Sequence, residues 1–143
     1  MALTLDAARS IVDTALRTAR AKKFQPLAVA VLDQRGKLKA FAAEDGTSLG
    51  RAEIAIGKAH GALVFGIGSR ELGVRAEQRP HFMAAVTAAV GGSLVPVAGG
   101  VLIKDGAGET IGAVGVSGDN SDNDEAAAVA GIEAASLKAQ VGA

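Results

Sequence analysis

Residues 111–125, IGAVGVSGDNSDNDE, change within a short distance from an apolar, glycine-containing run to acids, amides and a serine. The apolar half predicts a strand over residues 110–117 that is buried on both faces, because it lacks the polar alternation of a half-exposed strand. The polar half predicts a loop, and the alanine-rich segment after it predicts a helix from Ser121 or Asp122 to about Lys138. A buried strand that delivers oxygen-bearing side chains to the start of a helix is the first place to look for a functional site.

Apolar patterns elsewhere in the chain predict further helices and two β-hairpins. Helical spacing predicts a long first helix and a second helix rich in alanine and glycine, and Pro80 can open a short third one. Short apolar runs on either side of turns that contain aspartate and glycine predict the hairpins. The expected helices cover residues 5–22, 49–65 and 81–90, and the expected strands cover 27–32, 37–43 and 101–103. Residues 71–79, rich in arginine and glutamate, are expected to form a polar connector.

The order of these elements, α-ββ-α-α-ββ-α, predicts an α+β fold. Hairpins pair their strands in antiparallel fashion, and nearly continuous apolar strands need cover on both faces of the sheet. We therefore expect a three-layer α/β/α sandwich around an antiparallel sheet, in a single domain that spans residues 1–143.

The composition argues against several classes of function. Lysine plus arginine and aspartate plus glutamate each total 15, and this balance disfavours a nucleic-acid partner. The absence of cysteine removes disulfides, thiolate metal ligands and a cysteine nucleophile. No apolar run approaches the length of a membrane span, and the first residues do not resemble a signal peptide. We therefore expect a cytoplasmic protein without a membrane partner.

The acidic loop contains Asp119, Asp122, Asp124 and Glu125. Carboxylates at this spacing suit either a hard cation or the capping of the helix that follows, and both interpretations stay open. The loop lacks the glycine and the terminal glutamate of an EF-hand, so no metal ligand is assigned. A further interpretation makes Asp124 or Glu125 a general base.

Basic side chains elsewhere are candidates for the same site. Arg70 and Arg79 suit the carboxylates or phosphates of a ligand, and the alternative is an ion pair with acids such as those of the loop. His60 and His81 are candidates for a haem ligand or a general base, although a histidine on a helix is commonly structural. Lys58 is a candidate amine catalyst if it is buried, and the alternative is a salt-bridged lysine. If the arginines meet the acidic loop, the two form one polar pocket.

Two segments, GKAHGALVFGIGSREL and GGVLIKDGAGETIGAVGVSGDNSDNDEAAAVAGI, resemble the GlcG/HbpS family, also called the DUF336 or haem-degrading-domain family. The resemblance covers about residues 5 to 140, and IGAVGVSGD followed by DE is its most specific part. It implies an α/β/α sandwich around an antiparallel sheet, assembled as a homo-oligomer of up to an octamer. It also implies that some members bind haem, whereas others belong to catabolic operons.

The resemblance also implies which residues contribute to a site. The matched positions are Asp45 before the second helix, Lys58 within it, Gly99 and Gly100 before the third strand, and the signature loop with Ser117, Asp119, Asp124 and Glu125. His60 departs from the residues that many members carry after the matched lysine and alanine, which makes it the candidate special to this branch.

Three functions stay open at this point. The first is a small-molecule-binding protein that holds haem, or another planar or carboxylated ligand, at the edge of an oligomer. The second is a cofactor-independent lyase or isomerase acting on a carboxylated or aromatic catabolic intermediate. In that enzyme His60 or an acid of the loop is the base, and Arg70 or Arg79 anchors the substrate. The third is a structural or accessory oligomer.

Overall fold

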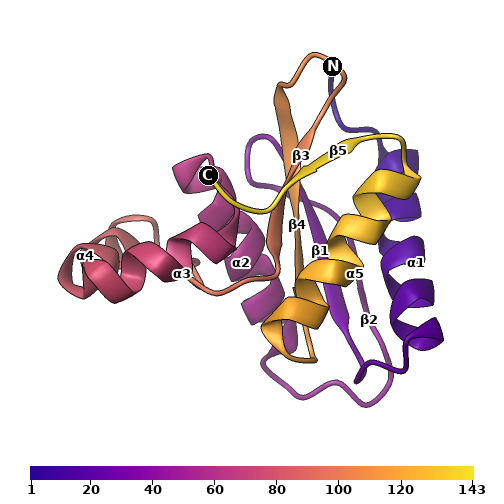
Figure 1. Ribbon diagram of the computed structural model, residues 1–143, viewed down its shortest axis with the longest axis horizontal. Coiled ribbons are helices and arrows are strands. Elements are labelled where there is room, and N and C mark those ends of the chain that lie inside the picture. Colours follow the sequence, from indigo (N-terminus) through magenta and orange to yellow (C-terminus); the bar gives the residue numbers. More distant parts are fainter.

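A five-stranded antiparallel sheet lies between two helical layers in the computed structural model, which describes residues 1–143 (Figure 1). The strands are β1 (Ala28–Asp33), β2 (Leu38–Ala43), β3 (Gly100–Lys104), β4 (Thr110–Ser117) and β5 (Lys138–Gln140). The helices are α1 (Leu5–Ala21), α2 (Arg51–Phe65), α3 (Ser69–Gln78), α4 (Pro80–Ala89) and α5 (Ser121–Ala134). No helix combines the length and the apolar character needed to cross a membrane.

The two predicted hairpins lie side by side in the sheet, whose strand order is β2-β1-β4-β3-β5. Helices α1 and α5 cover one face of the sheet and α2 covers the other. The predicted α+β sandwich around an antiparallel sheet is therefore confirmed.

In the middle of the sheet, large side chains face α1 and α5 and small ones face α2, whereas Leu32 and Leu102 also pack against α2. Val29 and Val31 point into the core beneath α1 and α5. Ala30 and Gly115 point toward α2. Because neighbouring residues of a strand face opposite ways, the small residues on the α2 side let this helix approach the sheet closely.

Helix α2 rests directly on a pair of glycines. Gly100 of β3 and Gly115 of β4 are partners across the ladder. A Cβ atom at Gly115 would lie 1.8 Å from the carbonyl oxygen of Ala55, and one at Gly100 would lie 2.2 Å from that of Lys58. The small residues of α2 therefore serve close packing against the sheet.

The prediction of a polar connector over residues 71–79 is wrong, because this segment belongs to helix α3. Its buried Leu72 packs with Ile67, Met83 and Leu94 in a small apolar cluster apart from the main core. These contacts come from the segments directly before and after α3, and the charged pattern of residues 71–79 does not reveal them.

Two details of the last helix also differ from the prediction. Asn120, rather than Ser121 or Asp122, is the N-cap, since its side chain accepts a hydrogen bond from the Asn123 amide at 2.8 Å. The helix ends at Ala134 instead of near Lys138. Beyond it the chain turns through Ser136, whose φ is 61°, and forms the short strand β5 against β3.

Helices α3 and α4 project away from the sandwich (Figure 1). Residues 80–103 contain no aspartate, glutamate, lysine or arginine. Within α4 only Met83 is buried, and Phe82 is exposed. The projecting helix therefore presents an uncharged, largely apolar surface.

Candidate functional site

Hydrogen bonds to Asp119 hold the loop between β4 and α5 in place. Its carboxylate accepts from the backbone amides of Gln25 and Asn120, each at 2.7 Å, and from Nδ2 of Asn123 at 2.8 Å. These bonds, that of Gln25 first, lower the pKa of Asp119. A carboxylate whose pKa falls on folding stabilises the fold above its unfolded pKa of about 4, and this contribution is lost as the pH falls through the folded value. Asp119 thus ties the loop to the segment before β1.

Lys58 and Asp124 form a buried ion pair behind this loop. Lys58 Nζ lies 3.1 Å from Oδ2 of Asp124 and donates a hydrogen bond to the carbonyl oxygen of Val116 at 2.9 Å. The two residues are 2% and 1% exposed. Burial lowers the pKa of Lys58 and raises that of Asp124, because each charge loses its hydration. Through these contacts Lys58 connects α2 with β4, at Val116, and with the first turn of α5, at Asp124.

The predicted ligand-binding residues around this pair contact groups of the protein itself. Gly99 makes room for the lysine, since a Cβ atom there would lie 2.8 Å from Lys58 Nζ. The amide of Gly100 donates to the Ser69 hydroxyl at 2.6 Å. The Ser117 hydroxyl accepts from Arg51 Nη1 at 3.1 Å.

Arg70 forms ion pairs with two acids of the acidic loop. The prediction that arginines meet this loop therefore holds for Arg70. Its Nε donates to Oε2 of Glu125 at 3.0 Å, and its Nη2 donates to Oε1 of Glu125 at 3.1 Å and also to Oδ1 of Asp122. These bonds, those of Glu125 first, raise the pKa of the Arg70 guanidinium. The remaining nitrogen, Nη1, makes no hydrogen bond within the protein.

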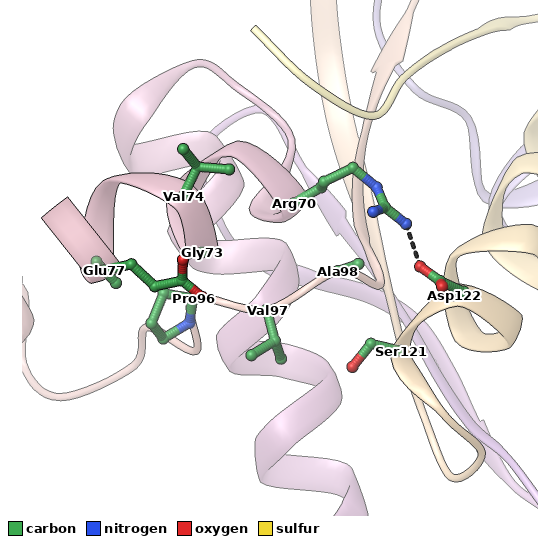
Figure 2. A pocket seen from close by; sticks show the side chains of 10 residues that line it. Arg70, Gly73, Val74, Glu77, Pro96, Val97, Ala98, Ser121 and Asp122 are labelled. Atoms are coloured by element: carbon green, nitrogen blue, oxygen red, sulfur yellow. Dashed lines mark hydrogen bonds and ion pairs between the residues drawn. The ribbon is translucent and has the colours of Figure 1, made fainter.

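A cleft of about 550 Å³ opens beside Arg70, between α3 and the loop that leads into β3 (Figure 2). Helix α3 and residues 96–98 supply apolar wall residues, and Ser121 and Asp122 lie at the start of α5. The lining residues are Arg70, Gly73, Val74, Ala76, Glu77, Pro96, Val97, Ala98, Ser121 and Asp122. A ligand with an apolar body and an anionic group would meet apolar wall residues and one guanidinium here, beside the carboxylates of Glu77 and Asp122.

Haem fits this cleft only in part. The apolar walls suit a porphyrin ring, and Arg70 suits its carboxylates. None of the 10 lining residues is histidine, cysteine, methionine or tyrosine, the usual protein ligands of haem iron. The cleft therefore offers apolar contacts for the ring and one cation for the carboxylates, but two acids, Glu77 and Asp122, repel those carboxylates and no residue is a usual ligand for the iron. No cluster of three or more acids or histidines is arranged to hold a bare metal ion.

The structure does not bring His60 to the acidic loop. Its Nδ1 lies 2.6 Å from the carbonyl oxygen of Ser93, and its ring packs against Gly36 in the β1–β2 turn. The sheet register pairs Ala28, at the start of β1, with Ser117, so the turn and the acidic loop lie at opposite ends of these strands. A base at His60 and an acid of the loop therefore do not share one site.

Three other predicted residues also lie outside the Arg70 cleft. The Arg79 guanidinium lies 4.6 Å from the centre of the Phe82 ring, and His81 is exposed at the start of α4. Asp45 lines a separate cleft of about 430 Å³. That cleft is also lined by Arg20, Pro26, Ala43 and Glu44.

The sequence-based predictions do not include the apolar wall of the cleft. Val74 lies in the segment expected to be a polar connector, and Val97 lies in a loop. A usable signal exists in the helical spacing of Leu72 with Ala76 and in the pair of Glu71 with Arg75, whose charges lie 3.9 Å apart. Nothing local to residues 96–98 indicates that they face α3.

The chain is similar to known proteins along most of its length. The family described as "Haem degrading protein HbpS-like" matches residues 3–133. The crystal structure of HbpS shares 29% identity, covers 94% of this chain and 90% of that chain, and has a TM-score of 0.80. A PduOC:haem complex shares 23% identity, covers 96% of this chain and 97% of that chain, and has a TM-score of 0.84.

A DUF336 protein, ORFY of Klebsiella pneumoniae, shares 22% identity, covers 94% of this chain and 90% of that chain, and has a TM-score of 0.84. At this level of identity, ORFY and PduOC show a common fold alone. No curated protein matches the chain. Because the match to the family extends over residues 3–133, from α1 into α5, the chain belongs to the HbpS-like family of haem-degrading proteins.

Proposed function

We propose that this protein binds a small molecule with a planar apolar body and carboxylate groups, and that haem is the first ligand of this class to test. The observation that supports the proposal is the cleft between α3 and residues 96–98, with its apolar walls and Arg70. The family match and the haem complex of a similar fold, PduOC, direct the choice to haem.

In this proposal Val74 and Val97 contact the ring, and Arg70 binds a carboxylate. Haem would bring the redox chemistry of its iron, and a protein ligand for that iron would have to come from outside the 10 lining residues. Binding has more support than catalysis, because Lys58 and Asp124 neutralise one another away from the cleft.

Replacing Val97 by aspartate should weaken haem binding about tenfold or more. The new carboxylate would stand on an apolar wall and repel the carboxylates of the ligand. Titration with haem, followed by the Soret band, measures the change. Val64→Asp is the matched control, because Val64 is 41% exposed, Val97 is 42% exposed, and Val64 does not line the cleft.

Two histidine variants test which side chain, if either, is a ligand of the haem iron. His60→Ala should keep the wild-type spectrum, because His60 lies at the far end of the sheet strands. His81→Ala tests whether the exposed imidazole at the start of α4 is the ligand. A wild-type protein that leaves the Soret band of stoichiometric haem unchanged would contradict the proposal.

We also propose that the protein is a homo-oligomer, and α4 supports this. An uncharged helix with one buried residue leaves an apolar surface exposed to water, and such surfaces are typical of protein interfaces. A second copy of the same uncharged surface is a suitable partner, because like apolar surfaces carry no charge to desolvate.

Ala85→Glu should dissociate this oligomer into smaller species, since it places a charge in the middle of the exposed face of α4. Size-exclusion chromatography with light scattering measures the mass. Ala134→Glu, at an exposed position of α5, should leave the mass unchanged. A monomeric wild-type protein would rule out the proposed assembly.

A further inference from the structure

We infer that Asp122 competes with the ligand for Arg70, so that the cleft favours molecules whose carboxylate displaces the Asp122 side chain from the guanidinium. Asp122 is then a specificity-determining residue of the cleft. This inference rests on the proposed function, because the ligand concerned is the one proposed for this cleft.

The two carboxylates on Arg70 are held very differently. Glu125 accepts from both Nε and Nη2, and its side chain is only 14% exposed. Asp122 accepts from Nη2 alone, and its side chain is 79% exposed. Water can solvate Asp122 as soon as it leaves, so its bond to Arg70 costs little to break. Glu125 therefore positions the guanidinium, while Asp122 is exchangeable.

The exchangeable contact, between Arg70 and Asp122, also lies at the cleft. Arg70 and Asp122 both line it, and Glu125 does not. Figure 2 shows the Arg70 and Asp122 side chains facing each other at one end of the cleft. A carboxylate that arrives through the cleft therefore approaches the part of the guanidinium that Asp122 contacts.

A ligand carboxylate can bind this guanidinium better than Asp122 does. Arg70 Nη1 has no partner within the protein, so a carboxylate that spans Nη1 and Nη2 gains two parallel hydrogen bonds. Asp122 uses only Nη2, and its charge repels the incoming anion until it moves away. A ligand without a carboxylate leaves the Asp122 contact intact and gains nothing from Arg70.

The test uses the full-length protein and three probes: haem, metal-free protoporphyrin IX with its two free carboxylates, and protoporphyrin IX dimethyl ester. Porphyrin fluorescence gives the affinity without any iron ligand. Asp122→Asn should bind protoporphyrin IX about two- to fivefold more tightly, the range that an exposed ion pair contributes. Arg70→Gln should bind it about tenfold more weakly. Neither variant should change the affinity for the ester.

Asp13→Asn is the matched control, because it removes the same charge at an exposed position of α1 that does not line this cleft. Equal affinities of Asp122→Asn and Asp13→Asn for protoporphyrin IX would overturn the inference, while haem binding by the wild type would leave the proposed function standing. An equal gain in the affinity of Asp122→Asn for the dimethyl ester would also overturn the inference. The ester has no free carboxylate, so such a gain would come from a wider cleft and not from the loss of competition for Arg70.

A different combination of results separates this inference from the proposal that haem is the ligand. A gain by Asp122→Asn for protoporphyrin IX alone, without any haem spectrum in the wild type, would support the inference and remove haem as the ligand. If neither the wild type nor Asp122→Asn bound any of the three probes, both proposals would fail.

Discussion

Asp124→Asn should lower the free energy of unfolding by about 3–5 kcal/mol, because it leaves the buried Lys58 ammonium without its anionic partner. The substitution keeps the size of the side chain and the acceptor for the Asp119 amide, which lies 2.9 Å from Oδ1 of Asp124. The substitution removes the charge and also replaces Oδ2, which accepts from Lys58, by an amide nitrogen that cannot accept. Chemical denaturation at one fixed protein concentration measures the effect, since the apparent stability of an oligomer depends on concentration.

Asp122→Asn is the control within the same turn of α5. Its carboxylate is exposed, so this variant should lose no more than about 1 kcal/mol. The double variant Lys58→Met with Asp124→Asn should be more stable than Asp124→Asn alone, because no unpaired charge stays buried. If Asp124→Asn unfolded at the wild-type denaturant concentration, the pair would not hold these elements together.

Gly115→Ala should cost about 3 kcal/mol or more, because helix α2 has no room to accept a methyl group on β4. The added Cβ atom would lie 1.8 Å from the carbonyl oxygen of Ala55 and 3.0 Å from the amide nitrogen of Ala59. Both are backbone atoms, so no side chain can turn away and α2 itself has to move. Denaturation curves under the same conditions measure the loss.

Gly106→Ala provides the comparison for this second variant. It introduces the same methyl group in the β3–β4 turn, where a Cβ atom would have no neighbour within 4 Å and the backbone needs no positive φ. Its stability should stay within about 1 kcal/mol of the wild type. Similar losses for the two variants would show that close packing of α2 on the glycine pair is not the cause.

These two contacts also control the geometry of the proposed cleft. The Lys58–Asp124 pair fixes the start of α5, where Asp122 precedes and Glu125 follows Asp124. The glycine pair in turn fixes α2, which carries Lys58. Loss of either contact should therefore disturb the alignment of the two carboxylates with Arg70 as well as the stability of the fold.

The local pattern of the chain was enough to predict most of the fold. Short apolar runs without polar alternation predicted the buried strands, and such a run is read from neighbouring positions without reference to any distant residue. Turn residues and helical spacing likewise act within a few positions of one another. Five helices and five strands result, of which α3 and β5 were not predicted: the charged residues of α3 outweighed its local helical spacing, and β5 depends on pairing with the distant β3.

Only the tertiary structure separated the roles of the four acids in the acidic loop. They are alike in sequence, yet Asp119 binds backbone amides, Asp124 is buried against Lys58, and Asp122 and Glu125 meet Arg70. Asp119 also has local partners, but the partners that distinguish the acids, Gln25, Lys58 and Arg70, lie 52 to 94 positions away in the chain, too far for any local pattern to encode. The sequence by itself determined that this loop carries acids at the start of a helix. Burial and distant partners decided which acid is structural and which one faces the cleft.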